Sequence, residues 1–309
     1  MIDGSAQQLT ALRRHIVFVI VAAIVPAVLL AMAIMGYDYY VRERDREVRD
    51  SIAVARAMAA GVDAELAGVK AALFALATSP YLETGDLAAF HRQASAALKE
   101  QGFANIAVLD SELRQLMNTF RPVGEPLPAQ GGPESLKRAF SLGQPVVTDL
   151  FTGPVVKEPL VAVGVPVRRD GNVRYLLGAA ITPQRLAQIL TQQQVPAEWV
   201  AVIFDGSGTI VARTRGAERF VGHKGTAPLL AAIKESPEGW VEAPTVEGIP
   251  VVGVYSRAPL SGWSVAIGIP TAYFNAHLLY SLARIFLITF IMLAVAVLLA
   301  VLLVRRMAG

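Results

Sequence analysis

The sequence contains no cysteine among its 309 residues, and this absence excludes several classes of site at once. Without a thiol, the chain cannot form a disulfide, a cysteine-based zinc site, a redox pair or a cysteine nucleophile. Its folded part must therefore be held together by its own hydrophobic core. The absence is also compatible with a compartment outside the cytoplasm, although it does not identify one.

Recognisable catalytic motifs are missing too. The histidines at positions 15, 91, 223 and 277 stand at no metal-ligand spacing, and no His-Glu-x-x-His pattern occurs. Gly206-Ser207-Gly208 lacks the spacing of a nucleophile elbow, and residues 222–225 lack that of a phosphate-binding loop. We therefore expect no catalytic residue, no metal and no cofactor. The net charge of +3 gives no support to nucleic-acid binding.

Two long apolar runs stand near the two ends of the chain, and they hold much of its 54% hydrophobic residues. Ile16–Met35 and Ile285–Val304 each contain about 20 residues and no charged side chain, which is the length of a helix that crosses a bilayer. The sequence therefore predicts transmembrane helices at residues 16–37 and 282–304.

Arginine pairs at residues 13–14 and 305–306 set the expected orientation of these spans. Positively charged residues favour the cytoplasmic side of a membrane, so residues 1–15 and 305–309 are expected in the cytoplasm. Residues 38–281 are then expected outside it, in the periplasm of a Gram-negative cell, with the spans in the inner membrane. A cleaved signal peptide is disfavoured, because the first run is longer than a usual signal core and no clear cleavage site follows it.

A stalk helix is predicted for residues 38–78. Apolar and small residues recur there in steps of three and four, as in a heptad seam: Ile52, Ala55, Ala59, Val62, Leu66, Val69, Leu73 and Leu76. Two interpretations of this seam stay open. It packs on the chain's own domain, or it forms the contact of a homodimer, and the residues allow some of both.

Short runs of β-branched and apolar residues, broken by Gly, Pro and Asp, predict strands after residue 79. The expected strands are Asn105–Leu109, Leu113–Phe120, Val146–Asp149, Pro159–Val167, Val173–Ile181, Val200–Phe204, Thr209–Thr214, Trp240–Ala243, Val251–Arg257 and Trp263–Ile269. Helices are expected at Asp86–Gln101, Glu134–Leu142, Pro183–Gln194 and Thr226–Lys234. Thr182-Pro183 is a good helix start, with Thr as the cap and Pro in the first turn.

This order of elements repeats within the chain. Ile106–Asp110 resembles Val200–Asp205, and Leu176–Pro183 resembles Val265–Pro270, at an offset of about 90 residues. Two strands, a helix and three strands form a small antiparallel sheet with helices on one side. We therefore expect an α+β chain with two tandem sheet modules, at residues 79–195 and 196–275.

A stalk helix, two tandem sheet modules and a membrane helix on each side together resemble the double Cache sensor domain of bacterial transmembrane receptors, such as sensor histidine kinases. The resemblance covers residues 40–275 and rests on the stalk helix and on Ile106–Asp110, Pro145–Gly153, Leu160–Val167 and Gly262–Pro270. It implies PAS-like modules, a membrane-distal one at residues 79–195 and a membrane-proximal one at residues 196–275, with a small molecule bound in the distal module. The Arg-x-Trp-Tyr type signature of the amino-acid-binding subgroup is not found, which argues against an amino acid as the ligand.

The family's outputs include histidine kinases, diguanylate cyclases and chemotaxis receptors. Only Met307, Ala308 and Gly309 follow Arg306, so we expect an input region whose cytoplasmic signalling module is absent from this sequence, in the first place that of a sensor histidine kinase. The alternative is a membrane-anchored binding or adaptor protein that signals through a partner. An extracytoplasmic enzyme or chaperone stays as a further rival.

Polar residues near strand ends of the distal module are the candidate ligand-binding residues: Asn118, Arg121, Thr148, Asp149, Lys157 and Tyr175. In a PAS-like pocket, such side chains fix a ligand that apolar neighbours bury. Arg121 or Lys157 is suited to pair with a carboxylate, and Asp149 is suited to accept from an amine or to fix a loop. The alternative for each is a surface salt bridge or a turn cap. The proximal module offers Arg213, Tyr255 and Arg257.

Overall fold

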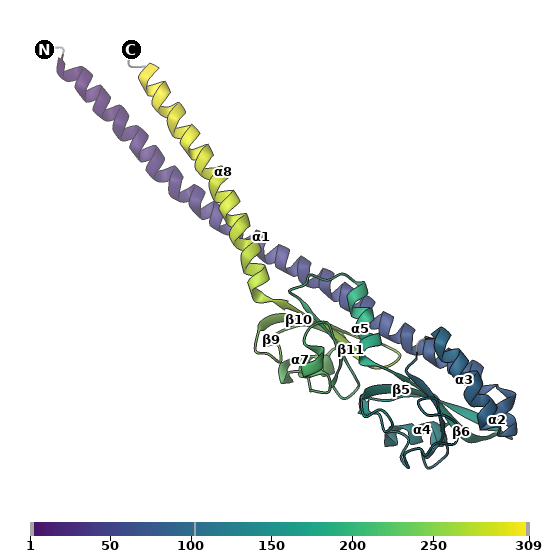
Figure 1. Cartoon of the computed structure of the whole chain (residues 1–309). Helices are drawn as coiled ribbons and strands as arrows, with labels where there is room; N and C mark the ends of the chain where they lie inside the picture. Colours follow the sequence, from purple (N-terminus) through teal and green to yellow (C-terminus); the bar gives the residue numbers. More distant parts are fainter. Residues whose placement is uncertain (1–2, 102, 307–309) are drawn as a thin grey trace. The chain divides into compact units, whose positions relative to one another are not determined.

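The computed structural model of the chain describes residues 3–101 and 103–306, which divide into two compact units. One unit combines the residues up to 49 with those from 271 onward, and the other is residues 50–270. The first contains the beginning of helix α1 (Asp3–Ala77) and all of helix α8 (Thr271–Arg306), drawn in purple and yellow in Figure 1. In this unit the guanidinium of Arg44 lies 5.9 Å from the ring centroid of Phe274, which is buried.

The predicted membrane spans fall in α1 and α8. Over its described residues, the structure contains no helix that combines the length and the apolar character of a membrane span. Side chains at many positions of Ile16–Met35 and Ile285–Val304 lie outside the described residues. The spans at 16–37 and 282–304 therefore stay predictions.

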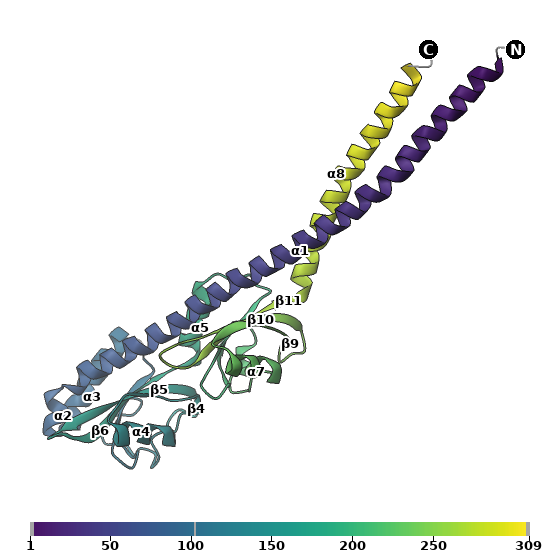
Figure 2. The ribbon, with the colours of Figure 1, turned by 180° about the vertical axis from the view of Figure 1, so that it is seen from behind.

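In the second unit, one face of α1 is buried along most of its length. Ala55, Ala59, Val62, Leu66 and Leu73 each expose at most 4% of their surface. All five belong to the predicted seam. The interpretation that the seam packs on the chain's own domain is therefore confirmed, and Figures 1 and 2 show both sheets beside this part of α1.

The distal module contains an antiparallel sheet of six strands in the order β2-β1-β6-β5-β3, with β4 also paired to β5. Its strands are β1 (Asn105–Leu109), β2 (Gln115–Asn118), β3 (Val146–Val147), β4 (Phe151–Thr152), β5 (Pro159–Arg169) and β6 (Asn172–Ile181). Its short helices are α2 (Pro80–Thr84), α3 (Leu87–Gln101), the 3-10 turn η1 (Glu134–Leu136) and α4 (Lys137–Leu142).

The proximal module contains a five-stranded antiparallel sheet in the order β8-β7-β11-β10-β9. Its elements are β7 (Val200–Phe204), β8 (Ile210–Arg213), α6 (Ala217–Phe220), α7 (Ala227–Glu235), β9 (Glu238–Pro244), β10 (Pro250–Arg257) and β11 (Ser264–Pro270). The two sheets have the same order once β1 is matched to β7 and β6 to β11. The α+β fold with two antiparallel sheets is thus confirmed, and it is consistent with tandem PAS-like modules.

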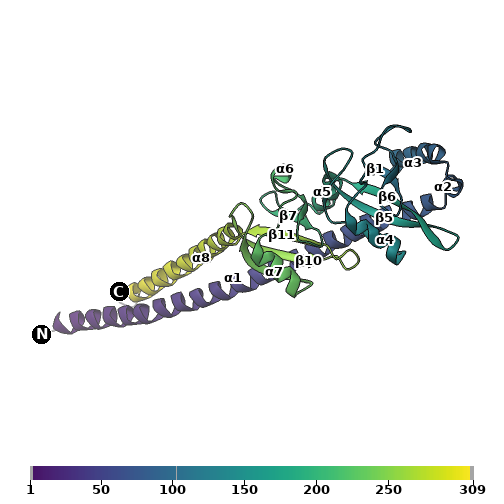
Figure 3. The same cartoon turned by 90° about the horizontal axis from the view of Figure 1, so that it is seen from below.

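Helix α5 (Pro183–Gln192) joins the two modules and contacts β5 of one sheet and β7 and β8 of the other. Figure 3 shows it between the two sheets. The predicted cap is confirmed, because the hydroxyl of Thr182 accepts a hydrogen bond from the backbone N–H of Arg185. A Cβ atom at Gly61 of α1 would lie 2.9 Å from Cγ2 of Ile189, so glycine permits the close approach of α5 to α1.

Some strands are shorter than the sequence predicts, for local reasons. The expected strand Leu113–Phe120 narrows to β2, because Leu113 has a φ of 61° and belongs to a tight turn. The expected strand Val146–Asp149 narrows to β3, and there the hydroxyl of Thr148 accepts from the N–H of Ala162 beyond the paired residues. The elements α2, α6 and β4 were not expected, since each has only a few residues.

Asp63 fastens the proximal sheet to α1. It is a buried residue, and its two carboxylate oxygens accept hydrogen bonds from the N–H groups of Leu260 and Ser261, at 2.8 and 2.9 Å. Arg56 of α1 adds an exposed bidentate pair with Glu238 of β9, with both N–O distances at 2.9 Å. Exposed ion pairs contribute little to stability, so Asp63 is the stronger of the two attachments.

The junction between the modules is held by two aspartates. Asp205 is buried after β7, and its Oδ2 accepts from the N–H of Leu150 at 3.0 Å. In the other direction, the Oδ1 of Asp149 accepts a hydrogen bond from the N–H of Gly206 at 3.1 Å. Burial and the charge of Asp205 raise the pKa of the Asp149 carboxyl, against the opposing effects of the Gly206 N–H and of Lys224.

The two aspartates predict opposite effects of the same substitution. Asp149→Asn keeps an oxygen for Gly206 and removes the repulsion from Asp205, so we expect a more stable protein at pH 7. A carboxyl whose folded-state pKa is raised makes the protein less stable as pH rises. Below a pH of about 4 this carboxyl is protonated in both the folded and the unfolded state, so the gain from Asp149→Asn should disappear there.

Asp205→Asn removes one of two acceptor oxygens and should lower the free energy of unfolding by about 1–3 kcal/mol. Urea unfolding at pH 3.5 and 7 measures both, and a loss of stability in Asp149→Asn at pH 7 would contradict the assignment.

Candidate functional site

A cavity of about 450 Å³, its mouth included, lies on the distal sheet. Residues of β1, β2, β5 and β6 line it, together with Phe151, residues 153–156 and Leu136. The described lining residues are Asn105, Ala107, Leu109, Gln115, Asn118, Phe120, Gly131, Leu136, Phe151, Gly153, Pro154, Val155, Val156, Leu160, Ala162, Gly178, Ala179 and Ala180. The apolar walls are those of a site for a small organic molecule.

A chain of three amides supplies the polar part of this cavity. The Nδ2 of Asn105 donates to Oδ1 of Asn118 at 2.9 Å, and the Nδ2 of Asn118 donates to Oε1 of Gln115 at 2.7 Å. The Nε2 of Gln115 then donates to the carbonyl oxygen of Gly131 at 3.3 Å. Asn105, Gln115 and Asn118 are all buried.

Backbone groups fix which way each amide faces. The N–H of Phe120 donates to Oδ1 of Asn118, and the N–H of Ala180 donates to Oδ1 of Asn105. A backbone N–H can only donate, so these oxygens cannot be exchanged with the nitrogens. Each amide nitrogen carries two hydrogens and uses one in the chain of amides, so the second is left to donate elsewhere. The wall therefore suits oxygen atoms of a ligand.

Charged side chains are absent from the lining given above, among the residues that the structure describes. The described part of the chain also contains no group of three His, Cys, Asp or Glu side chains that is suited to hold a metal ion. The distal cavity thus offers neutral donors and apolar surface.

Gly178 makes room in the floor of the cavity. It lies opposite Gly164 in the register of β5 and β6. A Cβ atom at Gly178 would have its nearest neighbour 3.8 Å away, whereas one at Gly164 would lie 3.1 Å from Leu136. A methyl group at position 178 would therefore occupy part of this space without a clash. Glycine inside a strand is the feature of the sequence that could have indicated this space.

Asn118 is the predicted site residue that lines the cavity. The fully buried Thr148 forms a pair of backbone and side-chain hydrogen bonds with Ala162 of β5. Asp149 belongs to the module junction described above. Of these three residues, only Asn118 lines the cavity.

The side chains of Arg121 and Lys157, on which the expectation of a carboxylate ligand rested, are exposed and do not line the cavity. Arg121 forms an exposed pair with Glu125 at 3.3 Å. Lys157 has a φ of 58° in the turn between β4 and β5. Tyr175 lies in a separate polar groove on the module, where its hydroxyl accepts from Arg174. Sequence reasoning missed Asn105 and Gln115, whose signal was a polar residue within an apolar strand.

A second cavity, of about 500 Å³ with its mouth included, lies on the proximal sheet, and Arg213 lines it. The other two polar residues that the sequence singled out in this module have structural partners instead. The hydroxyl of Tyr255 donates to the carbonyl oxygen of Ala232 at 2.9 Å, and Arg257 donates to that of Ile233. Both thus hold the end of α7 on the sheet.

No protein-family model and no curated protein matches the sequence. Solved structures do match its fold. The extracellular domain of the histidine kinase rpHK1S-Z16 aligns with 75% of this chain and 96% of its own length, at a TM-score of 0.61 and 13% identity. The sensory domain of the Campylobacter jejuni chemoreceptor Tlp3, solved with isoleucine, aligns with 76% of this chain and 97% of its own length, at a TM-score of 0.55 and 14% identity.

The ligand-binding domain of Mlp24, solved with asparagine, aligns with 77% of this chain and 98% of its own length, at a TM-score of 0.57 and 16% identity. At these identities the likeness concerns the fold. The resemblance to the double Cache arrangement, which the sequence predicted from the order of its elements, is thereby confirmed: this chain has the fold of extracellular sensory domains of histidine kinases and chemoreceptors.

Proposed function

We propose that this chain is the extracytoplasmic ligand-sensing input region of a bacterial transmembrane receptor, with its ligand in the distal cavity. The observation that carries the proposal is the buried chain of amides in the lining of an otherwise apolar cavity, where each amide nitrogen has a second N–H beyond the hydrogen bond described above. Such donors are costly to bury without acceptors, and a ligand oxygen supplies one. The fold of the sensory domains named above supports the same function.

The ligand we propose is a small uncharged organic molecule with a carbonyl oxygen. Asparagine, which the Mlp24 domain holds, has such an oxygen in its side-chain amide. The lining of the cavity contributes neutral amides in place of charged side chains, so a ligand with uncharged polar groups fits it better than a zwitterion does. This agrees with the missing amino-acid signature in the sequence.

The proposed topology places residues 38–281 outside the cytoplasm, with spans at 16–37 and 282–304 in the inner membrane. Ligand binding would then favour one packing of the distal module, and α1 would carry that bias toward the membrane as a shift between two populations. The output we propose is a histidine kinase. A chemotaxis receptor, a diguanylate cyclase or a separate partner protein is an alternative, and a stand-alone anchored binding protein is another.

A thermal-shift screen of the full chain in detergent micelles tests the ligand proposal. The probes are isoleucine, asparagine, γ-aminobutyrate, acetamide, uracil and lactate. A ligand of the folded state raises the melting temperature by mass action, with about 2.7 kcal/mol gained at a hundredfold excess over Kd.

Gly178→Val is the decisive variant in this screen, because it fills the cavity and leaves the amides in place. We expect it to retain or raise the melting temperature without ligand and to lose the ligand shift. Arg121→Ala is the matched control and should keep the shift, since its side chain lies outside the lining. A shift that survives Gly178→Val would place the ligand elsewhere, and no shift with any probe would favour a partner-binding role.

A homodimer through the stalk helix is part of the proposal, and it would use the face of α1 opposite the buried seam. Small residues recur on that face in steps of three and four: Ala53, Ala57, Ala60, Ala64, Gly68, Ala71 and Ala75. All seven are exposed in the single chain. Helices with such a stripe can approach one another closely.

Two substitutions of Gly68 separate dimerisation from folding. A Cβ atom at Gly68 would have no neighbour within 4 Å, so the fold accepts a side chain there. Gly68→Ala should stabilise the helix by about 1 kcal/mol and keep the dimer. Gly68→Arg should reduce dimerisation at least tenfold in sedimentation equilibrium. Equal association of the two variants would argue against a stalk dimer.

A further inference from the structure

The proximal cavity lies on the sheet of the proximal module, and its walls are almost entirely apolar. Val200, Val202 and Ala266 line it from the sheet, and Leu229 of α7 and Val246 of the β9–β10 turn line it from other sides. Gly253 and Gly268 lie opposite each other in the register of β10 and β11, and both belong to the lining. A Cβ atom at Gly253 would be 3.5 Å from its nearest neighbour, at ordinary contact distance.

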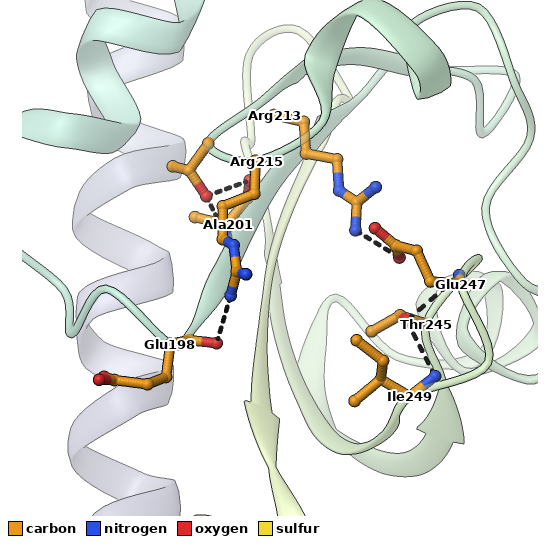
Figure 4. A network of polar contacts seen from close by, with 8 residues as sticks. Glu198, Ala201, Arg213, Arg215, Thr245, Glu247 and Ile249 are labelled. Carbon is orange, nitrogen blue, oxygen red and sulfur yellow. Dashed lines mark hydrogen bonds and ion pairs between the residues drawn. The ribbon is translucent and has the colours of Figure 1, made fainter.

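Arg213, at the end of β8, is the charged residue of this lining. Its side chain is only 2% exposed, and its Nη2 donates to Oε2 of Glu247 at 2.6 Å. Its guanidinium carbon also lies 4.5 Å from the ring centroid of Phe220. The Nη1 nitrogen is buried and has no hydrogen-bond partner within the described part of the chain. Figure 4 shows the guanidinium and the Glu247 carboxylate directed toward each other.

An unpaired N–H of a buried guanidinium is expensive. A buried donor without an acceptor costs about 1–3 kcal/mol, and the cost is larger for a charged group. The strongest acceptor for a guanidinium is a carboxylate, which can take two parallel hydrogen bonds. Arg213 therefore has an unused capacity for an anionic oxygen beside an empty apolar space.

Glu247 is a partner that a ligand can displace. It lies in the turn between β9 and β10, where the hydroxyl of Thr245 accepts from the N–H groups of Glu247 and Ile249 (Figure 4). Its side chain is 27% exposed, so it can reach water when it leaves Arg213. Burial raises the pKa of the Glu247 carboxyl, but hydrogen bonds from Arg213 and Thr245 outweigh burial and hold this pKa below its ordinary value. Glu247 is thus a carboxylate that already pairs with the arginine.

We propose that the proximal module contains a second ligand site, which binds a short-chain monocarboxylate. The carboxylate would pair with Arg213, and the hydrocarbon chain would lie against Val200, Val202 and Leu229. The site is independent of the distal cavity, whose lining has neutral amides. The chain would then respond to two chemically different small molecules through one folded unit.

Isothermal titration of the full chain in detergent micelles tests this site, with propionate, butyrate and isovalerate as probes and butyramide as the uncharged control. Each acid should bind at millimolar or lower concentration, and butyramide should bind at least tenfold more weakly. Arg213→Met should reduce acid binding at least tenfold. Glu247→Gln should increase it several-fold, because it removes the competing carboxylate.

Two cavity-filling variants locate the site and keep the test valid if Arg213→Met does not fold. Gly253→Val retains the arginine but occupies the proximal cavity, so it should abolish acid binding. Gly178→Val fills the distal cavity and should leave acid binding intact, while it removes the ligand shift of the proposed distal site. Acid binding that persists in Gly253→Val, or that is lost in Gly178→Val, would overturn the proposal. Absence of binding for all three acids would overturn it too.

Discussion

The buried face of α1 is the element on which both modules are assembled. Each fully buried Val or Leu on that face contributes about 1.5–3 kcal/mol relative to exposure, and neither sheet could cover the helix alone over this length. Apolar burial has no direction, however, and would allow the sheets to slide along the helix. Asp63 and Gly61 supply the missing specificity. The first takes two backbone N–H groups from a single turn, and the second admits α5 at one position.

Polar contacts of the same kind hold the modules to each other. Across the junction, Asp205 accepts a hydrogen bond from the N–H of Leu150, and Asp149 accepts one from the N–H of Gly206. Each module thus places a carboxylate against the backbone of the other. The contact between the modules therefore includes two polar pairs.

The sequence could predict most of the fold because its local signals agree. The seam of α1, the Thr182-Pro183 helix start and the repeated strand order each follow from periodicity or from capping chemistry, which are local. The binding residues were harder, because a cavity depends on which side chains meet across strands. Asn118 was found as a polar residue at a strand end. Asn105 and Gln115 were missed, because the residues next to them in the sequence do not show that their amides are hydrogen-bonded to that of Asn118.

The exposed cations were misleading for a related reason. Arg121 and Lys157 are chemically suited to a carboxylate, but an exposed side chain in a turn or a loop pairs most readily with a neighbour or with water. Arg213 was noted with less support, although it is the arginine that burial places against a cavity. Whether a cation faces a cavity or the surface depends on its burial. A single sequence indicates burial only through strand periodicity.

The glycines in the centres of the two sheets lower the stability of the sheets and leave volume for the cavities. Glycine in a strand interior weakens the sheet, because it contributes no side chain to packing and loses more entropy on folding. At Gly178 and Gly253 an added methyl group would meet no clash, so the sheet itself does not require glycine there. What those two positions preserve is unfilled volume. Each sheet is therefore less stable than it would be with alanine at these positions. One added methyl group would stabilise the sheet and take up part of the cavity beside it.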